Sequence, residues 1–272
     1  MKCHSGEISS FYGNPLTVFW RSVFVKYALL VYIHPMKDTV LIVVPAFNEE
    51  SSIGEVLIDL KAFVASRENF DVCVVNDGSF DSTSEIAHRS GVHVLDLPVN
   101  LGVGGALRAG YRYAFENGFN SVIHFDADGQ HQSEFIIEIV EALKDCDFVI
   151  GSRYGKDSAY PITPTVRIAQ IILSLLLRIC HGAKLSDPTS GFRGTKGKLI
   201  ETFSRSYPSP FLADTIGSII IAVNHDYEIK EIFTPMKERI NGEASHNFLQ
   251  RCKYFAIAVL LTVLWHERED KS

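Results

Sequence analysis

Ser121-Val122-Ile123-His124-Phe125-Asp126-Ala127-Asp128-Gly129-Gln130-His131 is the stretch from which the fold of this chain can be predicted. Its apolar run ends in two carboxylates one residue apart, and an amphipathic pattern of helical period follows. This order is typical of a buried strand that ends in a polar loop before a helix. Because open parallel sheets bind ligands at the carboxyl ends of their strands, the acidic residues are site candidates.

The two carboxylates, Asp126 and Asp128, predict a divalent cation beside them. Two neighbouring carboxylates repel and raise one pKa, whereas Mg²⁺ or Mn²⁺ prefers oxygen ligands and keeps both groups ionised. The Gln130 amide offers a further oxygen. His131 is expected to hydrogen-bond near this loop, with metal ligation as the alternative. A second interpretation of the motif is an acidic turn that caps the next helix.

Composition narrows the class of protein. With 272 residues and 46% hydrophobic content, the chain can bury a sizeable core. Its net charge of -6 and lack of a Lys/Arg run argue against nucleic acid as a partner. Its five cysteines are scattered, with no Cys-x-x-Cys pair, so we expect reduced, cytosolic thiols and neither a zinc site nor a disulfide framework.

Strand and helix signals alternate from Thr39 onwards, which predicts an α/β fold. We expect one Rossmann-like domain with a mostly parallel central sheet, flanked by helices and joined by right-handed crossovers. The predicted strands are 39–44, 70–75, 92–97, 121–125, 147–150 and 227–233. The predicted helices are 53–64, 82–89, one that opens within 100–105 and runs to about 117, 163–180, 208–223 and a last apolar or amphipathic one.

Several of these strands are followed closely by an acidic residue. Glu49 follows the first strand, Asp77 the second, and Asp126 with Asp128 the fourth. Because parallel strands end at the same edge, these carboxylates are expected to converge on one crevice suited to a nucleotide with a bound metal. Arg153 follows the fifth strand and is a candidate cation for phosphate.

A dinucleotide-binding fold is a rival interpretation. Gly102, Gly104 and Gly105, with Asp126 about twenty residues later, imitate its glycine-rich fingerprint. That fingerprint belongs at the first strand-to-helix turn, whereas these glycines follow the third predicted strand. We therefore expect the glycines to permit close approach of backbone to ligand or of helix to sheet.

Both ends of the chain are predicted to be appendages. We assign residues 1–38 to a poorly ordered accessory segment or an upstream extension of the reading frame, 39–246 to the main domain and 247–272 to a C-terminal helix. The apolar stretch 15–33 contains Arg21 and Lys26, which makes it a weak spanning segment. The apolar stretch 254–265 is shorter than the roughly 20 residues that cross a bilayer, so an interfacial or packed helix fits it better.

Five motifs occur in order across residues 39–246. They are Val44-Pro45-Ala46-Phe47-Asn48-Glu49-Glu50, Asn76-Asp77-Gly78-Ser79 with Asp81, Asn100 with Gly102 and Gly104, Asp126-Ala127-Asp128-Gly129-Gln130-His131, and Asp187-Pro188-Thr189-Ser190-Gly191-Phe192-Arg193. With these motifs the chain resembles the family 2 glycosyltransferases of the GT-A fold. It is most similar to the branch of dolichyl-phosphate mannose synthases and bacterial polyprenyl-phosphate glycosyltransferases.

The resemblance implies transfer of a hexose from a nucleotide diphosphate sugar (UDP or GDP), with inversion at the anomeric carbon. It assigns the base and ribose to Pro45, Phe47, Glu49 and Asp77, with Gly102 and Ala127 beside the donor. It assigns the divalent metal, Mg²⁺ or Mn²⁺, to Asp126, Asp128 and Gln130. It places Arg153 and Arg239 at phosphate groups, and it makes Asp187 a base or an acceptor-site residue.

The acceptor divides the remaining expectations. A hydroxyl acceptor needs a base to take its proton, whereas an ionised lipid phosphate does not. The apolar pattern of 163–180, next to the motif at Asp187, favours polyprenyl phosphate, although ordinary core packing also explains it. A saccharide or cell-wall glycan acceptor, with Asp214 as a weaker acceptor-side candidate, and a non-catalytic nucleotide-sugar-binding protein are the alternatives. We expect a cytoplasmic protein, peripheral at the inner face of the membrane, with an integral-membrane partner as a further expectation.

Overall fold

The computed structural model describes residues 38–155, 163–209, 213–237 and 248–264. The chain divides into two units, Met1–Lys37 and Asp38–Ser272, and all described residues belong to the second. The apolar stretch at 15–33 and the predicted phosphate contact Arg239 therefore lie outside the described residues.

The described part of the chain contains one seven-stranded sheet in the order β3-β2-β1-β4-β6-β5-β7. The strands are β1 (Val40–Ala46), β2 (Phe70–Asn76), β3 (His93–Asp96), β4 (Ser121–His124), β5 (Phe148–Ser152), β6 (Arg193–Lys196) and β7 (Ile229–Phe233). Of the six pairs of neighbouring strands in this sheet, four are parallel: β1–β2, β1–β4, β2–β3 and β5–β7. The predicted mostly parallel sheet is confirmed. Nothing in the sequence pattern predicts β6, which runs antiparallel to β4 and β5.

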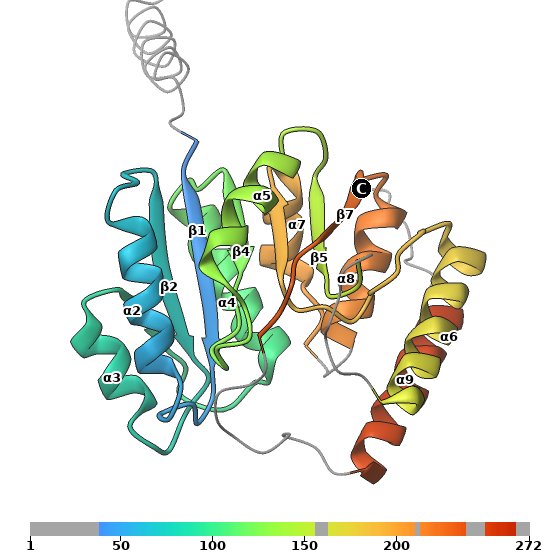
Figure 1. The fold of residues 1–272 in the computed structure, drawn as a ribbon, viewed down its shortest axis with the longest axis horizontal. Coiled ribbons are helices and arrows are strands. Elements are labelled where there is room, and N and C mark those ends of the chain that lie inside the picture. The colour runs from blue at the N-terminus through green and yellow to red at the C-terminus, as the bar shows by residue number, and fades with distance from the viewer. Residues whose placement is uncertain (1–37, 156–162, 210–212, 238–247, 265–272) are drawn as a thin grey trace, which may run out of the picture. The chain divides into compact units, whose positions relative to one another are not determined.

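Helices cover both faces of this sheet (Figure 1). One face packs against α2 (Ile53–Val64), α3 (Thr83–Ser90) and α5 (Ile136–Ala142), which follows the short 3-10 helix η1 (Ser133–Phe135). The other face packs against α4 (Val103–Glu116), α7 (Lys198–Ser206) and α8 (Ala213–Asn224). Beyond α8, the helices α6 (Pro164–His181) and α9 (Phe248–Leu264) pack against each other.

The central strand β1 shows why the sequence forms this sheet. Its side chains alternate between the two apolar clusters, with Ile42 and Val44 in one and Leu41 and Val43 in the other. All four are fully buried. A continuous β-branched and aliphatic run is what a strand covered on both faces requires, because neither face meets water.

The C-terminal half departs from the prediction at two places. For the helix predicted over 208–223, the structure describes α8 over Ala213–Asn224 and has Pro208 and Ser209 outside a helix, and the segment 193–206 forms β6 and α7, which were not predicted. The strand β6 is short and polar, and its pairing partners lie far away in the sequence. Thr195 is fully buried, and its hydroxyl is paired with that of Tyr111 at 2.8 Å, while Gly194 leaves room for Ile139. These partners belong to other elements, so the local pattern gives no strand signal.

The topology brings the loops of interest to one edge. Strands β2, β1 and β4 are parallel neighbours, so the segments after them begin at the same edge of the sheet. Strand β5 runs in the same direction, because β6 is antiparallel to both β4 and β5. The segment before β6 therefore also lies at this edge. The carboxyl ends of four strands and the loop ending at Arg193 thus meet along the lower edge of the sheet in Figure 1.

Candidate active site

Two histidines hold the carboxylate of Asp126. His124 Nε2 lies 2.9 Å from Asp126 Oδ1, and His131 Nε2 lies 3.3 Å from Oδ2. The backbone N–H of Asp126 donates to His131 Nδ1 at 3.0 Å, so in the neutral ring the proton resides on Nε2, facing the carboxylate. Both histidine side chains are buried, whereas that of Asp126 is 34% exposed. The clamp therefore presents a carboxylate of defined orientation at the edge of the sheet.

His131 is fixed by aromatic packing. Its ring stacks on Phe192 with centroids 4.6 Å apart, and it meets the edge of Phe125 at 5.3 Å. Burial lowers its pKa, against the opposing effects of the Asp126 and Asp128 carboxylates. A neutral ring in this position is the hydrogen-bonding residue that the sequence predicted beside the acidic loop.

His124 is a residue that the sequence reasoning missed. It is the last residue of β4, is 3% exposed and pairs in register with Arg193 across the sheet. Its Nδ1 has no hydrogen-bond partner among the described residues. The available signal was its position two residues before Asp126, because residues i and i+2 of an extended chain point to the same side.

Asp128 shapes the loop that follows. Its Oδ1 accepts the N–H of Gln130 at 3.0 Å, and Gly129 between them has a positive φ of 76°. Gln130 in turn joins the loop to the segment after β7: its carbonyl accepts the N–H of Lys237 at 2.9 Å, and its side-chain amide donates to the Lys237 carbonyl at 3.4 Å. Metal ligation by the Gln130 amide oxygen stays a prediction.

Asp77 organises the neighbouring loop. It is 2% exposed, and its Oδ1 accepts the N–H of Leu101 at 2.7 Å. Burial raises its pKa, against the opposing effect of hydrogen bonds from the backbone of Leu101 and Gly102. A Cβ on Gly78 would lie 2.9 Å from the backbone of Asn100, so the two loops pack without space for a side chain. Asp77 thereby places Gly102 at the carboxyl edge.

The segment after β1 presents exposed aromatic rings. Phe47 is 39% exposed and Phe80 is 90% exposed, and their rings meet edge to face with centroids 6.2 Å apart. Glu49 follows Phe47 by two residues. Its Oε2 accepts a hydrogen bond from the Ser52 hydroxyl at 2.7 Å, and its backbone N–H donates to the Thr83 hydroxyl at 2.8 Å. Exposed rings at a loop edge are suited to stacking on a planar base. The sequence did not predict a role for Phe80, because only the acidic residues of the motif around it were considered as site candidates.

Arg153 and Asp187 form a buried ion pair. Arg153 Nε and Nη2 each donate to a different oxygen of Asp187 at 2.7 Å, and Nη2 also donates to Thr189 at 2.8 Å. Asp187 is fully buried, and its backbone N–H donates to Glu231 at 2.7 Å. Both carboxylate oxygens are therefore engaged by one guanidinium, an arrangement that orients Arg153 and leaves Asp187 poorly placed to act as a base.

Arg193 and Asp214 link this loop to α8. Arg193 is 1% exposed, and it donates to the carbonyls of Pro188, Ser190 and Thr215 at 2.7–2.8 Å. Burial raises the pKa of Asp214, against the opposing effect of the Arg193 guanidinium, and Asp214 Oδ1 has no partner among the described residues. The sequence placed Arg193 at the end of a motif, but its role in joining this loop to α8 depends on contacts that only the folded chain makes.

The Asp126–Asp128 pair suits a divalent cation bound together with a substrate. The described residues contain no group of three or more His, Cys, Asp and Glu side chains that could hold a metal by themselves. Mg²⁺ sites on nucleotide substrates need only one or two carboxylates, because phosphate oxygens and water complete the shell. A partly exposed Asp126 and a nearby Asp128 at the strand end meet this requirement.

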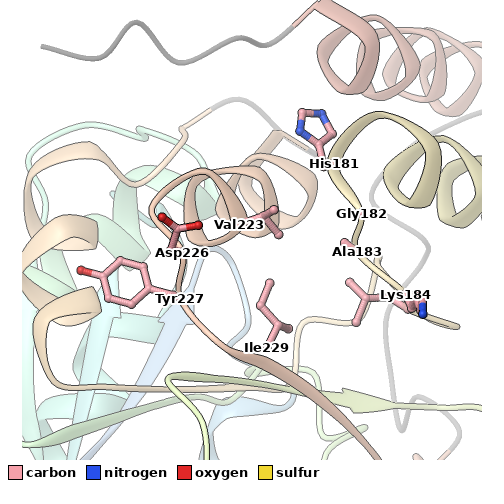
Figure 2. Close-up of a pocket in the computed structure, with 9 residues that line it drawn as sticks. His181, Gly182, Ala183, Lys184, Val223, Asp226, Tyr227 and Ile229 are labelled. Atoms are coloured by element: carbon pink, nitrogen blue, oxygen red, sulfur yellow. The ribbon is translucent and has the colours of Figure 1, made fainter.

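A pocket of about 450 Å³ lies elsewhere (Figure 2). It is lined by the C-terminal end of α6 at His181 and Gly182, by Val223 and Tyr227 around the end of α8, and by Ile229, the first residue of β7. Because β7 is parallel to β5, its first residue lies at the edge opposite to Arg153. This hollow is therefore separate from the carboxylates described above.

Comparison with known proteins gives one family match and several relatives. The family described as "Glycosyl transferase family 2" matches residues 41–203. An uncharacterized protein of Methanocaldococcus jannaschii is 35% identical over 200 residues, which are 72% of this chain and 80% of the relative. An undecaprenyl-phosphate mannosyltransferase of Micrococcus luteus is 37% identical over 160 residues, which are 57% of this chain and 65% of the relative.

Solved structures share the fold. Glucosyl-3-phosphoglycerate synthase from Mycobacterium tuberculosis, in complex with Mn²⁺, UDP and glucosyl-3-phosphoglycerate, superposes with a TM-score of 0.62. The match covers 84% of this chain and 79% of that chain at 22% identity. The predicted GT-A type of fold is thereby confirmed.

Proposed function

Because this chain belongs to glycosyl transferase family 2, we propose that it transfers a hexose from a nucleotide diphosphate sugar to polyprenyl phosphate, with inversion at the anomeric carbon. The observation that carries the proposal is the Asp126 carboxylate, which two buried histidines hold at the edge where four strand ends meet. This position, next to Asp128, is where the diphosphate of a donor would lie.

The donor would occupy the half of the site built by β1, β2 and β4. Its base would stack against the exposed rings of Phe47 and Phe80. The loop that Asp77 holds would bring Gly102 close to the donor, where a glycine permits approach of the backbone. A divalent metal, Mg²⁺ or Mn²⁺, would be held by Asp126 and Asp128, as Mn²⁺ accompanies UDP in the Mycobacterium tuberculosis synthase.

The reaction places negative charge on the leaving nucleotide diphosphate. A bound divalent metal supplies Lewis-acid stabilisation of that charge. The protein's own contribution is orientation: His124 and His131 prevent rotation of Asp126, and Asp187 prevents rotation of the Arg153 guanidinium. Groups that are already oriented need no rearrangement as charge develops, which is how fixed dipoles and ions lower a barrier.

The choice of acceptor depends on whether Asp187 is available as a base. An ionised lipid phosphate attacks without a base, whereas a sugar hydroxyl needs one. Both oxygens of Asp187 are bound by Arg153, so this residue favours the acceptor that needs no base. The undecaprenyl-phosphate mannosyltransferase of Micrococcus luteus supports the same acceptor class.

A saccharide or cell-wall glycan acceptor is the second candidate. The observation that favours it is Asp214, a buried carboxyl whose Oδ1 has no partner among the described residues and whose pKa is raised by burial. A carboxyl with a raised pKa is suited to take a proton from a hydroxyl. The test below separates the two acceptors.

The experiment incubates the purified full-length chain and Mn²⁺ with a panel of UDP- and GDP-hexoses, with and without polyprenyl phosphate. Mass spectrometry identifies the product, and a chelator control removes the metal. We expect a glycosylated polyprenyl phosphate that disappears on chelation. Labelling of water-soluble glycans alone would overturn the lipid acceptor, and unchanged turnover with chelator would overturn the metal.

A lipid acceptor also indicates where in the cell the protein acts. A polyprenyl acceptor resides in a bilayer and a nucleotide sugar in the cytoplasm, so we propose that the protein works peripherally at the cytoplasmic face of the membrane. Among the described residues, one helix, Pro164–His181, has the length and apolar composition of a membrane span. An integral-membrane partner stays a prediction.

A further inference from the structure

Helix α6 has two apolar faces, and only one of them is covered. Leu173 and Leu177 are buried against the rest of the domain, whereas the opposite face is exposed. That exposed stripe is formed by Ile168, Ile171, Ile172, Leu175 and Ile179, which are 39–69% exposed. Their spacing of three and four residues puts them on one side of the helix.

Packing into the hydrophobic core does not explain the apolar composition of α6. Pro164–His181 has the length and apolar composition of a membrane span, but only 17% of it is buried inside the structure, so it is not a core helix. The exposed helix of a soluble domain normally presents polar side chains to water. Five aliphatic residues in one stripe instead indicate a second apolar phase on that side.

Helix α9 repeats the pattern beside it. Ala258 and Thr262 are buried, and Leu260, Val263 and Leu264 on the other side are 44–64% exposed. The two helices are in contact, and the His181 ring of α6 hydrogen-bonds the Thr262 carbonyl at 2.8 Å. Each helix of the pair therefore carries an uncovered apolar stripe, and the two helices lie together at the right of Figure 1.

The charges on these helices differ from those of the whole chain. The chain has 32 Asp and Glu residues against 26 Lys and Arg, yet neither α6 nor α9 contains an acidic residue. Exposed cations do occur on them, at Arg178 and Lys253. Apolar stripes on two helices that carry cations but no acidic residue of their own complement a bilayer whose headgroups are negative.

We propose that the exposed stripes of α6 and α9 seat the protein on an anionic lipid bilayer. A second copy of the chain fits this surface less well, because protein interfaces are enriched in aromatic residues, Met and Arg, whereas the α6 stripe contains only Ile and Leu. The functional purpose of this membrane contact rests on the proposed function, in which the acceptor lies in the bilayer. The binding tests themselves do not require glycosyl transfer.

The buried side of α6 connects this surface to the candidate active site. Gln170 accepts the Tyr154 hydroxyl at 2.5 Å and donates to Thr189 at 3.2 Å. Thr189 also accepts a hydrogen bond from Arg153. The helix that lies on the bilayer is thus bonded, on its other side, to the ion pair at the sheet edge, which places the active site next to the lipid surface.

The first test asks which residues touch lipid. Both tryptophans of the chain, Trp20 and Trp265, lie outside the described residues, so a Trp20→Phe/Trp265→Phe background allows one new reporter at a time. Leu175→Trp places it in the α6 stripe, and Ile58→Trp, at a position 72% exposed on α2, is the matched control. We expect vesicles of phosphatidylcholine and phosphatidylglycerol with brominated acyl chains to quench only the Leu175→Trp protein. Vesicle-bound protein with unquenched Trp at 175 would overturn the proposal.

The second test measures binding by vesicle flotation of the full chain. Ile171→Glu/Leu175→Glu should weaken binding at least about 100-fold, because two aliphatic side chains leave the lipid and two charges oppose it. Ile58→Glu should leave binding unchanged, and Arg178→Ser should weaken it about fivefold on anionic vesicles only. Unchanged flotation of the double variant, or wild-type protein that dimerises and ignores vesicles, would overturn the proposal.

A transfer assay separates this proposal from the proposed function. With a short-chain, water-soluble prenyl phosphate as acceptor, the double variant should retain wild-type turnover, because its substitutions lie on the exposed side of α6. If neither wild type nor the double variant transfers sugar, but wild type binds vesicles, the double variant does not and the Leu175→Trp protein is quenched, the proposed function fails and the bilayer contact stands.

Discussion

The two halves of the sheet position their polar groups in different ways. In the half formed by β3, β2, β1 and β4, the carboxylates near strand ends are held by groups of the same strand or of adjoining loops, as Asp77 is by Leu101 and Asp126 by His124 and His131. In the half formed by β6, β5 and β7, the partners are side chains of separate elements, as in the pair of Arg153 and Asp187. The donor half is therefore a set of strand-loop-helix units, whereas the acceptor half is a network that forms only on folding.

The largest effect should come from the donor half. Asp128→Asn removes one proposed metal ligand's charge, so kcat should fall about 100- to 1000-fold, because charge stabilisation of a leaving group is a large part of such barriers. The midpoint of thermal unfolding should change little. Asp59→Asn, on the exposed face of α2, is the control. Equal turnover of the two variants would remove Asp128 from the metal site.

The acceptor half should respond in stability instead. Asp187→Ala leaves the Arg153 guanidinium without its buried partner, so the free energy of unfolding should fall by about 3–5 kcal/mol. Arg153→Ala and the double variant complete a cycle measured by denaturant unfolding. If the two single losses simply add, the pair is not coupled and the comparison between the halves fails.

The histidine clamp should show an intermediate effect on rate. His124→Leu removes the hydrogen bond to Asp126, so kcat should fall about tenfold with little change in the donor KM, because only orientation is lost. His124→Gln retains an N–H donor near the position of Nε2 and should restore part of kcat. A leucine variant with wild-type kcat, or a glutamine variant no better than leucine, would count against a positioning role.

Asp214 predicts a pH dependence. Its folded-state pKa is raised by burial, so its contribution to stability is complete below its ordinary pKa of 3.8 and is lost as pH rises through the raised value. Asp214→Asn stays neutral, so it should be at least as stable as wild type at neutral pH, with the difference shrinking toward acid pH. Unfolding midpoints across that pH range measure this, and a variant that is less stable only at neutral pH contradicts it.

The smallest effect should come from the exposed rings. Phe80→Ala should raise the donor KM about three- to tenfold without changing stability, because an aromatic stack contributes about 0.5–1.5 kcal/mol. Phe115→Ala, at a ring 45% exposed on α4, is the control. A donor KM equal to wild type would place the base elsewhere.

The sequence predicted the donor half well because its signals are local. The run Val40–Ala46, the acids after three of the strands and the glycines at the start of α4 all lie within a few residues of the structure they predict. The acceptor half defeated the same reasoning. The strand Arg193–Lys196 has no apolar alternation, and Pro208 and Ser209 lie outside the helix that was predicted to begin there. Asp187 was predicted as a base or an acceptor-site residue, because its partner Arg153 is 34 positions away in the sequence.

The sequence by itself determined the α/β alternation, the parallel sheet and the acidic residues at the strand ends, because periodicity and turn chemistry act over short stretches of chain. Only the tertiary structure decided which groups those acids contact. It gave Asp126 to two histidines, Asp187 to Arg153, and one apolar face of α6 to solvent. The physical reason is that burial and hydrogen-bond partners depend on packing between elements, which the local pattern of residues does not record.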